Sequence, residues 1–99
     1  MTINKSNENG KLTFVLEGRL DTNSAPELEA SFNGEGEGVN NVILDFLKLD
    51  YLSSAGLRVI LGMQKKMNAS DGEMTVKNVN ETIMEVFEIT GFSDILTIE

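Results

Sequence analysis

The sequence predicts an α/β fold: a mixed, mostly parallel sheet that begins with a hairpin and has its helices mainly on one face. Three features support this prediction. Apolar and polar residues alternate after an Asn-Gly dipeptide near the start, a continuous apolar run occupies Val42–Leu44, and stretches with helical spacing separate the later strands. Strands that alternate with helices form parallel pairs through crossover connections. With 99 residues and 40% hydrophobic content, residues 1–99 are expected to form one domain.

The first two strands are expected to pair as a hairpin. Lys11–Glu17 alternates apolar and polar side chains, which is typical of a half-buried strand, and Ile3 can begin a short partner strand. Asn9-Gly10 lies between them, and both of these residue types accept the positive φ angles of a tight turn.

The first helix is expected to begin near Ala25 and to stop at Gly34. Ser24–Glu27 has the pattern of a capping box, with Pro26 in the first turn, where its missing N–H costs nothing. The stretch that follows, Gly34–Gly38, predicts a mobile loop. A phosphate cradle is disfavoured there because the interleaved glutamates repel phosphate and no Gly-Lys-Ser/Thr ending follows.

Val42–Leu44 indicates a central strand covered on both sides, which ends in Asp45 and is followed by a short acidic loop. A helix is then expected from Ser54 to about Met67. The remaining elements are a strand over residues 74–79, a helix capped by Asn80 and ended by Gly91, and a short last strand over residues 95–98.

The entrance of the second predicted helix is the candidate functional site. Ser53–Leu57 begins with small residues that leave the surface open, and the free N–H groups of a first helical turn favour anions. The carboxyl ends of parallel strands share one edge of a sheet, so Asp21, Asp45 and Ser54 are expected to gather there. A phosphate on Ser54 would add roughly −1.5 to −2 charges beside Asp45 and Asp50.

Composition excludes several classes of function. The net charge is −8, which disfavours nucleic acid and anionic membranes as partners and fits a basic protein partner better. The chain has no cysteine and no histidine, which removes thiolate chemistry, the commonest metal ligand and the commonest general base. No stretch has the length of a membrane span or the pattern of a signal peptide, so a cytoplasmic protein is expected. Because cysteine and histidine are absent, we also expect a non-enzymatic protein without metal, cofactor or small-molecule substrate.

Several ordered motifs resemble the STAS domain, and most closely the bacterial anti-sigma factor antagonists. The motifs are Gly18–Asp21, Val42–Phe46, Leu52–Leu57, Gly72, Asn78-Val79, Phe87 and Thr90–Phe92. The resemblance implies a partner switch. An anti-sigma factor that is also a serine kinase binds the unmodified antagonist and releases its sigma factor, phosphorylation reverses this, and a PP2C-type phosphatase restores the unmodified form.

The same resemblance places the phosphorylated serine at Ser54, two positions before the glycine of the Gly-Leu pair. The family usually has aspartate where this chain has Ser53, and serine or threonine where it has Ala55. Ser53 is therefore the alternative acceptor, in which case Ser54 merely caps the helix. The residues expected to contact the partner are Asp21, Asp45, Asp50, Ser53, Ser54, Ala55, Gly56 and Arg58.

Other functions are less well supported by the residues. Asp21, Asp45 and Asp50 could form a magnesium site or a receiver-type phosphorylation site. The paired acidic residues expected after the first strand of a receiver are absent, however. A catalytic serine would lack a histidine base. The main alternative is a STAS subunit that binds the ATPase of a membrane lipid-transport ABC complex, and a scaffold subunit of a larger signalling assembly is a third reading.

Overall fold

The computed structural model describes residues 1–36 and 38–99, so Glu37 of the predicted glycine-rich loop lies outside the described residues. In chain order the elements are β1 (Thr2–Glu8), β2 (Lys11–Leu20), α1 (Ala25–Glu35), β3 (Asn41–Leu52), α2 (Ser54–Ala69), β4 (Glu73–Lys77), α3 (Glu81–Thr90), a 3-10 turn (Phe92–Asp94) and β5 (Thr97–Ile98).

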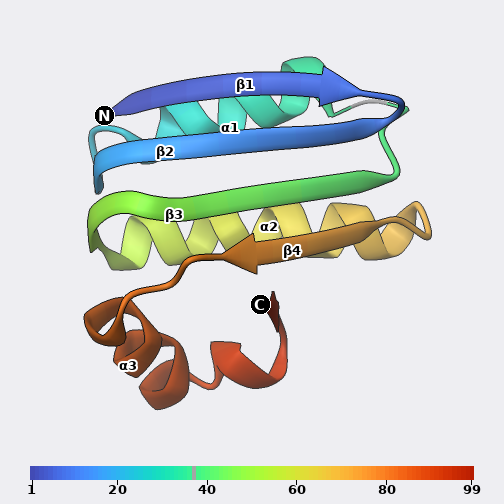
Figure 1. Cartoon of the computed structure of the whole chain (residues 1–99). Helices are drawn as coiled ribbons and strands as arrows, with labels where there is room; N and C mark the ends of the chain where they lie inside the picture. Colours follow the sequence, from blue (N-terminus) through green and yellow to red (C-terminus); the bar gives the residue numbers. More distant parts are fainter. Residues whose placement is uncertain (37) are drawn as a thin grey trace.

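The five strands form one sheet in the order β1-β2-β3-β4-β5 (Figure 1). β1 runs antiparallel to β2, and every other neighbouring pair is parallel. The hairpin turn lies at Asn9 and Gly10, whose φ angles are 53° and 83°. The predicted mixed sheet with an N-terminal hairpin is therefore confirmed.

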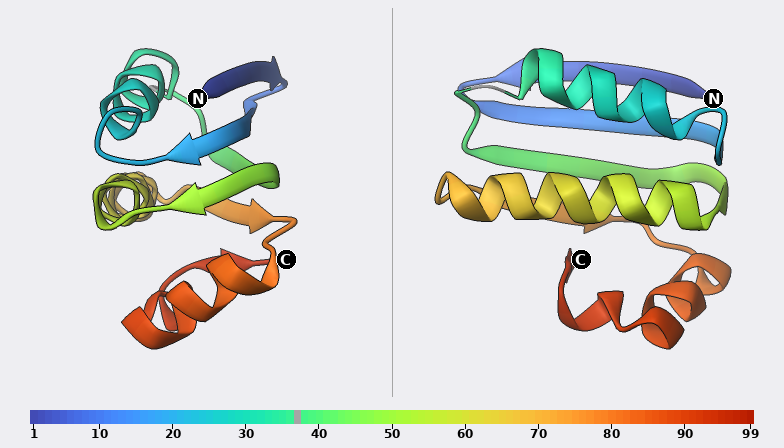
Figure 2. Two further views of the ribbon diagram at one scale, coloured as in Figure 1. Left: turned by 90° about the vertical axis from the view of Figure 1, so that its left-hand side faces the viewer. Right: turned by 180° about the vertical axis from the view of Figure 1, so that it is seen from behind.

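Both long helices, α1 and α2, lie on the same face of the sheet, and α3 lies at the side of the sheet that β4 and β5 form (Figure 2). The core lies between this face and the helices. Its fully buried large side chains include Leu12, Phe14, Leu16, Leu20, Leu28, Leu44, Phe46, Leu49, Ile60, Met63, Met67 and Phe87. This arrangement confirms the expected placement of the helices.

The expectation that the central strand is covered on both sides is wrong. β3 is central, but none of the helices in residues 1–36 and 38–99 covers the sheet face opposite α1 and α2 (Figure 2). Val42 and Leu44 belong to the core cluster, whereas Ile43, on the other parity, does not, although only 7% of it is exposed. A continuous apolar run therefore indicates burial, which the side chains of neighbouring strands can provide without a second layer of helices.

The expectation that β3 ends at Asp45 is also wrong, because the strand continues to Leu52. β2 likewise continues to Leu20, and the two strands stay paired to their ends. Register shifts between Val15 and Glu17 and between Gly18 and Arg19 interrupt the regular alternation of side chains. This irregular pairing makes the second half of β3 resemble a loop in sequence.

The helix ends follow the local signals with one exception. Asn80 caps α3 by accepting a hydrogen bond from the N–H of Ile83 (2.9 Å), and Gly91 ends it with a φ of 81°. α1 begins at Ala25 and ends at Glu35, one residue beyond the predicted stop. The last strand is shorter than expected, at two residues, because a 3-10 turn precedes it.

The exception is the predicted capping box at the start of α1. The side chain of Ser24 makes no capping hydrogen bond to the helix. Its hydroxyl instead donates to the carbonyl of Arg19 (2.6 Å) and accepts from the N–H of Asp21 (2.9 Å). The hydroxyl therefore stabilises the loop between β2 and α1. Within the described ranges, no helix is long and apolar enough to cross a membrane.

Candidate functional site

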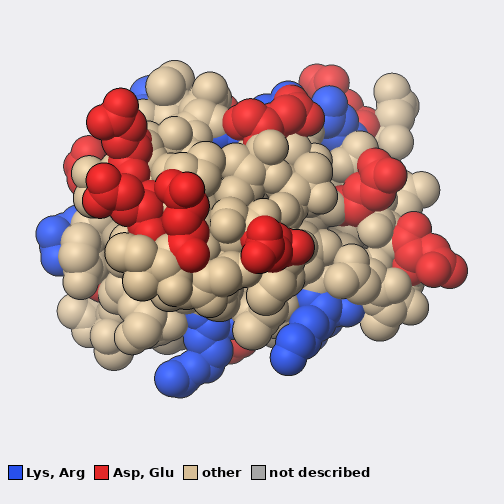
Figure 3. Space-filling model, turned by 90° about the horizontal axis from the view of Figure 1, so that it is seen from below, with Lys and Arg blue, Asp and Glu red and all other residues tan. Residues whose placement is uncertain are grey.

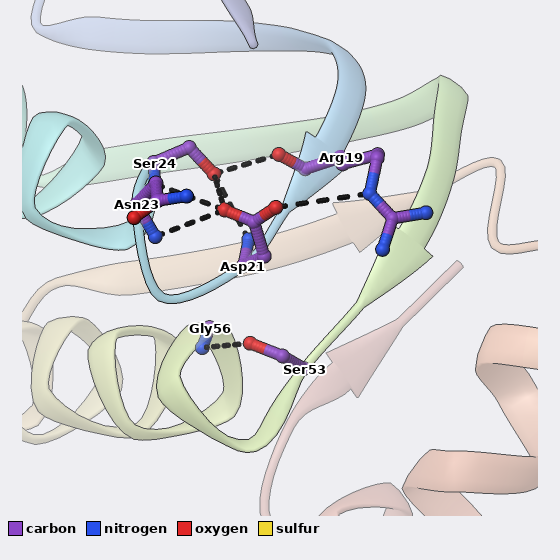
Figure 4. Close-up of polar contacts among 6 residues, drawn as sticks. All are labelled: Arg19, Asp21, Asn23, Ser24, Ser53 and Gly56. Atoms are coloured by element: carbon purple, nitrogen blue, oxygen red, sulfur yellow. Dashed lines mark hydrogen bonds and ion pairs between the residues drawn. The ribbon is translucent and has the colours of Figure 1, made fainter.

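The residue that precedes α2 is hydrogen-bonded to the last residue of β2. The N–H of Ser53 donates to the carbonyl of Leu20 (2.9 Å), and the Ser53 hydroxyl accepts from the N–H of Gly56 (3.3 Å) (Figure 4). Ser53 has extended backbone angles and is the N-cap of the helix. The expectation that Ser54 caps the helix, which belonged to the alternative assignment, is therefore wrong, because Ser53 is the N-cap.

Ser54 is the first residue of α2, and its side chain is exposed. Within residues 1–36 and 38–99, its hydroxyl has no hydrogen-bond partner, and the N–H groups of Ser54 and Ala55 have no acceptor. These N–H groups carry the positive end of the helix dipole. An exposed hydroxyl thus lies beside two free donors, an environment that tolerates a phosphate.

Gly56 serves a different purpose from the one that the sequence indicated. It is buried, and a Cβ at this position would lie 2.7 Å from Leu52 Cδ1 and 2.8 Å from Leu20 Cγ. The glycine lets the first turn of α2 pack against the ends of β2 and β3. Ala55 is half-buried. The small residues therefore serve packing as much as they keep the surface open.

The loop between β2 and α1, which contains Asp21, Asn23 and Ser24, lies next to the start of α2 (Figure 4). Asp21 Oδ1 accepts hydrogen bonds from the N–H groups of Asn23 (3.0 Å) and Ser24 (3.1 Å). The Ser24 N–H is the main cause that lowers the pKa of Asp21 below its ordinary value, and the nearby Arg19 guanidinium contributes least. Asp21 is therefore held ionised in a fixed loop.

Arg19 and Tyr51 form a feature that the sequence analysis missed. The Arg19 guanidinium lies 4.0 Å from the centre of the Tyr51 ring, and Arg19 Nε lies 3.7 Å from Asp21 Oδ2. Tyr51 is 41% exposed. The two residues are partners across β2 and β3 only because the register shifts between Gly18 and Arg19. No local pattern in the sequence reveals that shift.

The predicted gathering of Asp45 with Asp21 and Ser54 is wrong. Asp45 lies in the middle of β3, where it accepts hydrogen bonds from the N–H of Leu47 (3.0 Å) and from Asn78 Nδ2 (2.9 Å). It precedes the end of the strand by seven residues, which places it roughly 20 Å from the start of α2.

The remaining predicted contact residues, Asp50 and Arg58, are exposed near the end of β3 and one turn into α2, respectively. In the part of the chain that the structure describes, no three acidic side chains come together as a metal site.

Comparisons with known proteins agree with this geometry. A family model, the STAS domain, matches residues 2–99. The protein BtrV of Bordetella bronchiseptica, whose name places it among the anti-sigma factor antagonists, is 38% identical over 90 residues, which cover 90% of this chain and 78% of that protein. The anti-sigma-B factor antagonist of Staphylococcus aureus is 31% identical over 80 residues, 80% of this chain and 74% of that protein.

SpoIIAA of Bacillus, an anti-sigma factor antagonist, has the same fold. Its phosphorylated form matches this structure with a TM-score of 0.80 at 20% identity, over 99% of this chain and 91% of that chain. Its unphosphorylated form has a TM-score of 0.78 at the same identity, over 99% of this chain and 87% of that chain. The chain belongs to the STAS domain family and, within it, to the anti-sigma factor antagonists.

Proposed function

We propose that this chain is a phosphorylation-controlled antagonist of an anti-sigma factor that is also a serine kinase. Unmodified, it binds that kinase in the cytoplasm and frees the sigma factor; with phosphate on Ser54, it lets go. A PP2C-type phosphatase returns it to the binding form. The observation that carries the proposal is the exposed Ser54 hydroxyl, which lies beside free helix N–H groups and is bonded to no described residue. The chain acts by binding and catalyses nothing.

Ser54 fits the role of phosphate acceptor better than Ser53. A kinase needs the serine oxygen to attack the γ-phosphorus of ATP: the new O–P bond forms, the bond to the oxygen of ADP breaks, and the hydroxyl proton passes to a base of the kinase. The Ser53 oxygen is half-buried and accepts from the Gly56 N–H. Modifying it would disturb the helix cap, whereas the Ser54 oxygen is free to react.

Phosphate at this place changes the charge of a surface that already carries acids. It adds roughly −1.5 to −2 charges to a chain whose net charge is −8. Asp50 is exposed near the end of β3, and Asp21 is held ionised in the loop beside α2. An acidic group of the partner that tolerates the neutral serine would be repelled by the phosphoserine.

We place the rest of the docking surface on the same end of the sheet. Tyrosine and arginine often carry much of the binding energy of an interface, and the stacked pair Arg19 and Tyr51 presents both residue types to solvent. Together with Asp21 and Ser54, this pair defines the proposed docking surface. Asp45 lies too far along β3 to share a compact contact with them.

The test is phosphopeptide mapping after incubation with the cognate anti-sigma factor kinase and Mg-ATP. We expect phosphate on Ser54, normal binding but no modification for Ser54→Ala, and weak binding for Ser54→Asp. Ser53→Ala is the matched control: it removes the helix cap and should remain a substrate. Phosphate on Ser53 would overturn the choice of site. Capture of a transporter ATPase in place of a kinase-like anti-sigma factor would overturn the function.

A further inference from the structure

Arg58 is an exposed cation without a partner in the part of the chain that the structure describes. It lies on α2, and no ion pair or hydrogen bond there involves its side chain. Arg19 is the only other arginine of the chain, and its side chain is already engaged by Asp21 and the Tyr51 ring. Arg58 therefore has a guanidinium free to bind an anion.

The spacing of Arg58 brings it to Ser54. The two residues are four apart on the same helix, so their Cβ atoms lie on one face at about 5–6 Å. Long side chains on a helix lean toward its N-terminus, which brings the guanidinium back over the first turn. Ser53 has no such neighbour: the residue four further on is Leu57, which is buried.

We propose that Arg58 binds the phosphate of Ser54 within the same molecule. This rests on the proposed function in so far as Ser54 is the residue modified. Guanidinium groups bind phosphate with paired, charge-assisted hydrogen bonds. Phosphorylation then changes the surface in two ways. It adds negative charge, and it engages the Arg58 guanidinium, which in the unmodified protein is free to bind an acidic group of the partner.

The test places phosphoserine directly at position 54 during translation, so that no kinase is needed. Phosphorus NMR then gives the second pKa of the phosphate, ordinarily about 6, as the pH is varied. Binding to Arg58 favours the dianion, so Arg58→Gln should raise this pKa by roughly 0.3 unit. The difference should largely vanish at about 1 M salt, which screens exposed ion pairs.

Lys65→Gln is the matched control. Lys65 is also exposed on α2 and carries the same charge as Arg58, but it lies about 16 Å from Ser54 along the helix axis. It should leave the pKa of the phosphate close to that of the parent. An unchanged pKa in Arg58→Gln would overturn the inference, as would equal rises in both variants, which would show a general effect of net charge.

The two proposals fail separately. If the kinase modifies neither Ser54 nor Ser53, the proposed function fails whatever the phosphorus spectrum shows. If the kinase modifies Ser54 but Arg58→Gln leaves the pKa of the phosphate unchanged, only the present inference is lost. Arg58 is exposed, so its replacement leaves the core intact and the comparison is made between folded proteins.

Discussion

Gly56→Ala tests whether close packing at the start of α2 positions Ser54, the proposed phosphate acceptor. The added Cβ would lie 2.7 Å from Leu52 Cδ1, 2.8 Å from Leu20 Cγ and 3.1 Å from Leu20 Cδ2. Favourable contacts between carbon atoms lie at about 3.5–4.0 Å. Leu20 is completely buried and Leu52 is 7% exposed, and Leu20 Cγ is a branch point that rotation of the terminal methyl groups cannot move. The helix or the two leucines must therefore shift.

Two opposing contributions determine how much Gly56→Ala changes the free energy of unfolding. Overpacking a well-packed core costs about 1–3 kcal/mol. Replacing a helical glycine by alanine returns up to about 1 kcal/mol of helix propensity. Gly62→Ala provides the control on the same helix, because a Cβ there meets nothing within 4 Å. The propensity gain is common to both variants, so the difference between them isolates overpacking and should be about 1–3 kcal/mol.

Urea unfolding of the two variants and the parent protein measures this difference. We expect Gly62→Ala to be as stable as the parent or more stable, and Gly56→Ala to be less stable, with unchanged dependence on urea concentration. Gly56→Ala should also be phosphorylated more slowly, because the shifted helix carries Ser54 with it. Equal free energies of unfolding for the two alanine variants would refute the packing argument.

Three further predictions concern the loops around Ser54. Ser53→Ala removes the N-cap of α2 and should lower the free energy of unfolding by about 1 kcal/mol in urea titrations. The lowered pKa of Asp21 means that its ionised form stabilises the fold. This contribution is complete above the ordinary pKa of an aspartate and is lost as the pH falls through that value and then through the lowered pKa. The stability difference between the parent and Asp21→Asn, measured by urea unfolding at a series of pH values, should therefore be constant near neutral pH and shrink only below the ordinary pKa. Tyr51→Ala removes the ring that stacks with Arg19 and should weaken binding to the anti-sigma factor, measured by calorimetry, at least several-fold while leaving the fold intact.

The parts of the fold that the sequence predicted correctly are those governed by neighbouring residues. The hairpin turn follows from two adjacent residues that accept positive φ, Asn9 and Gly10. The limits of α3 follow from the capping side chain of Asn80 and the left-handed Gly91. In each case the signal and the structure lie within a few residues of each other, so no tertiary information was needed.

The errors arise where distant segments decide the outcome. β3 extends past Asp45 because β2 pairs with it through two register shifts, which no local pattern in either strand records. That longer strand separates Asp45 from Ser54 and brings Tyr51 beside Arg19. The predicted cap at Ser24 failed for a local reason: its hydroxyl accepts from the N–H of Asp21 and donates to the Arg19 carbonyl, and it makes no bond to the helix.

The geometry at Ser54 favours a switch that works by surface charge and needs no change of fold. The hydroxyl is already exposed, the free N–H groups of the first turn already face an incoming anion, and the packing around Gly56 fixes the helix that carries them. Attaching phosphate therefore requires no buried group to move. The consequence is that affinity for the partner should respond to the charge at position 54 and to salt, while the stability of the core should not.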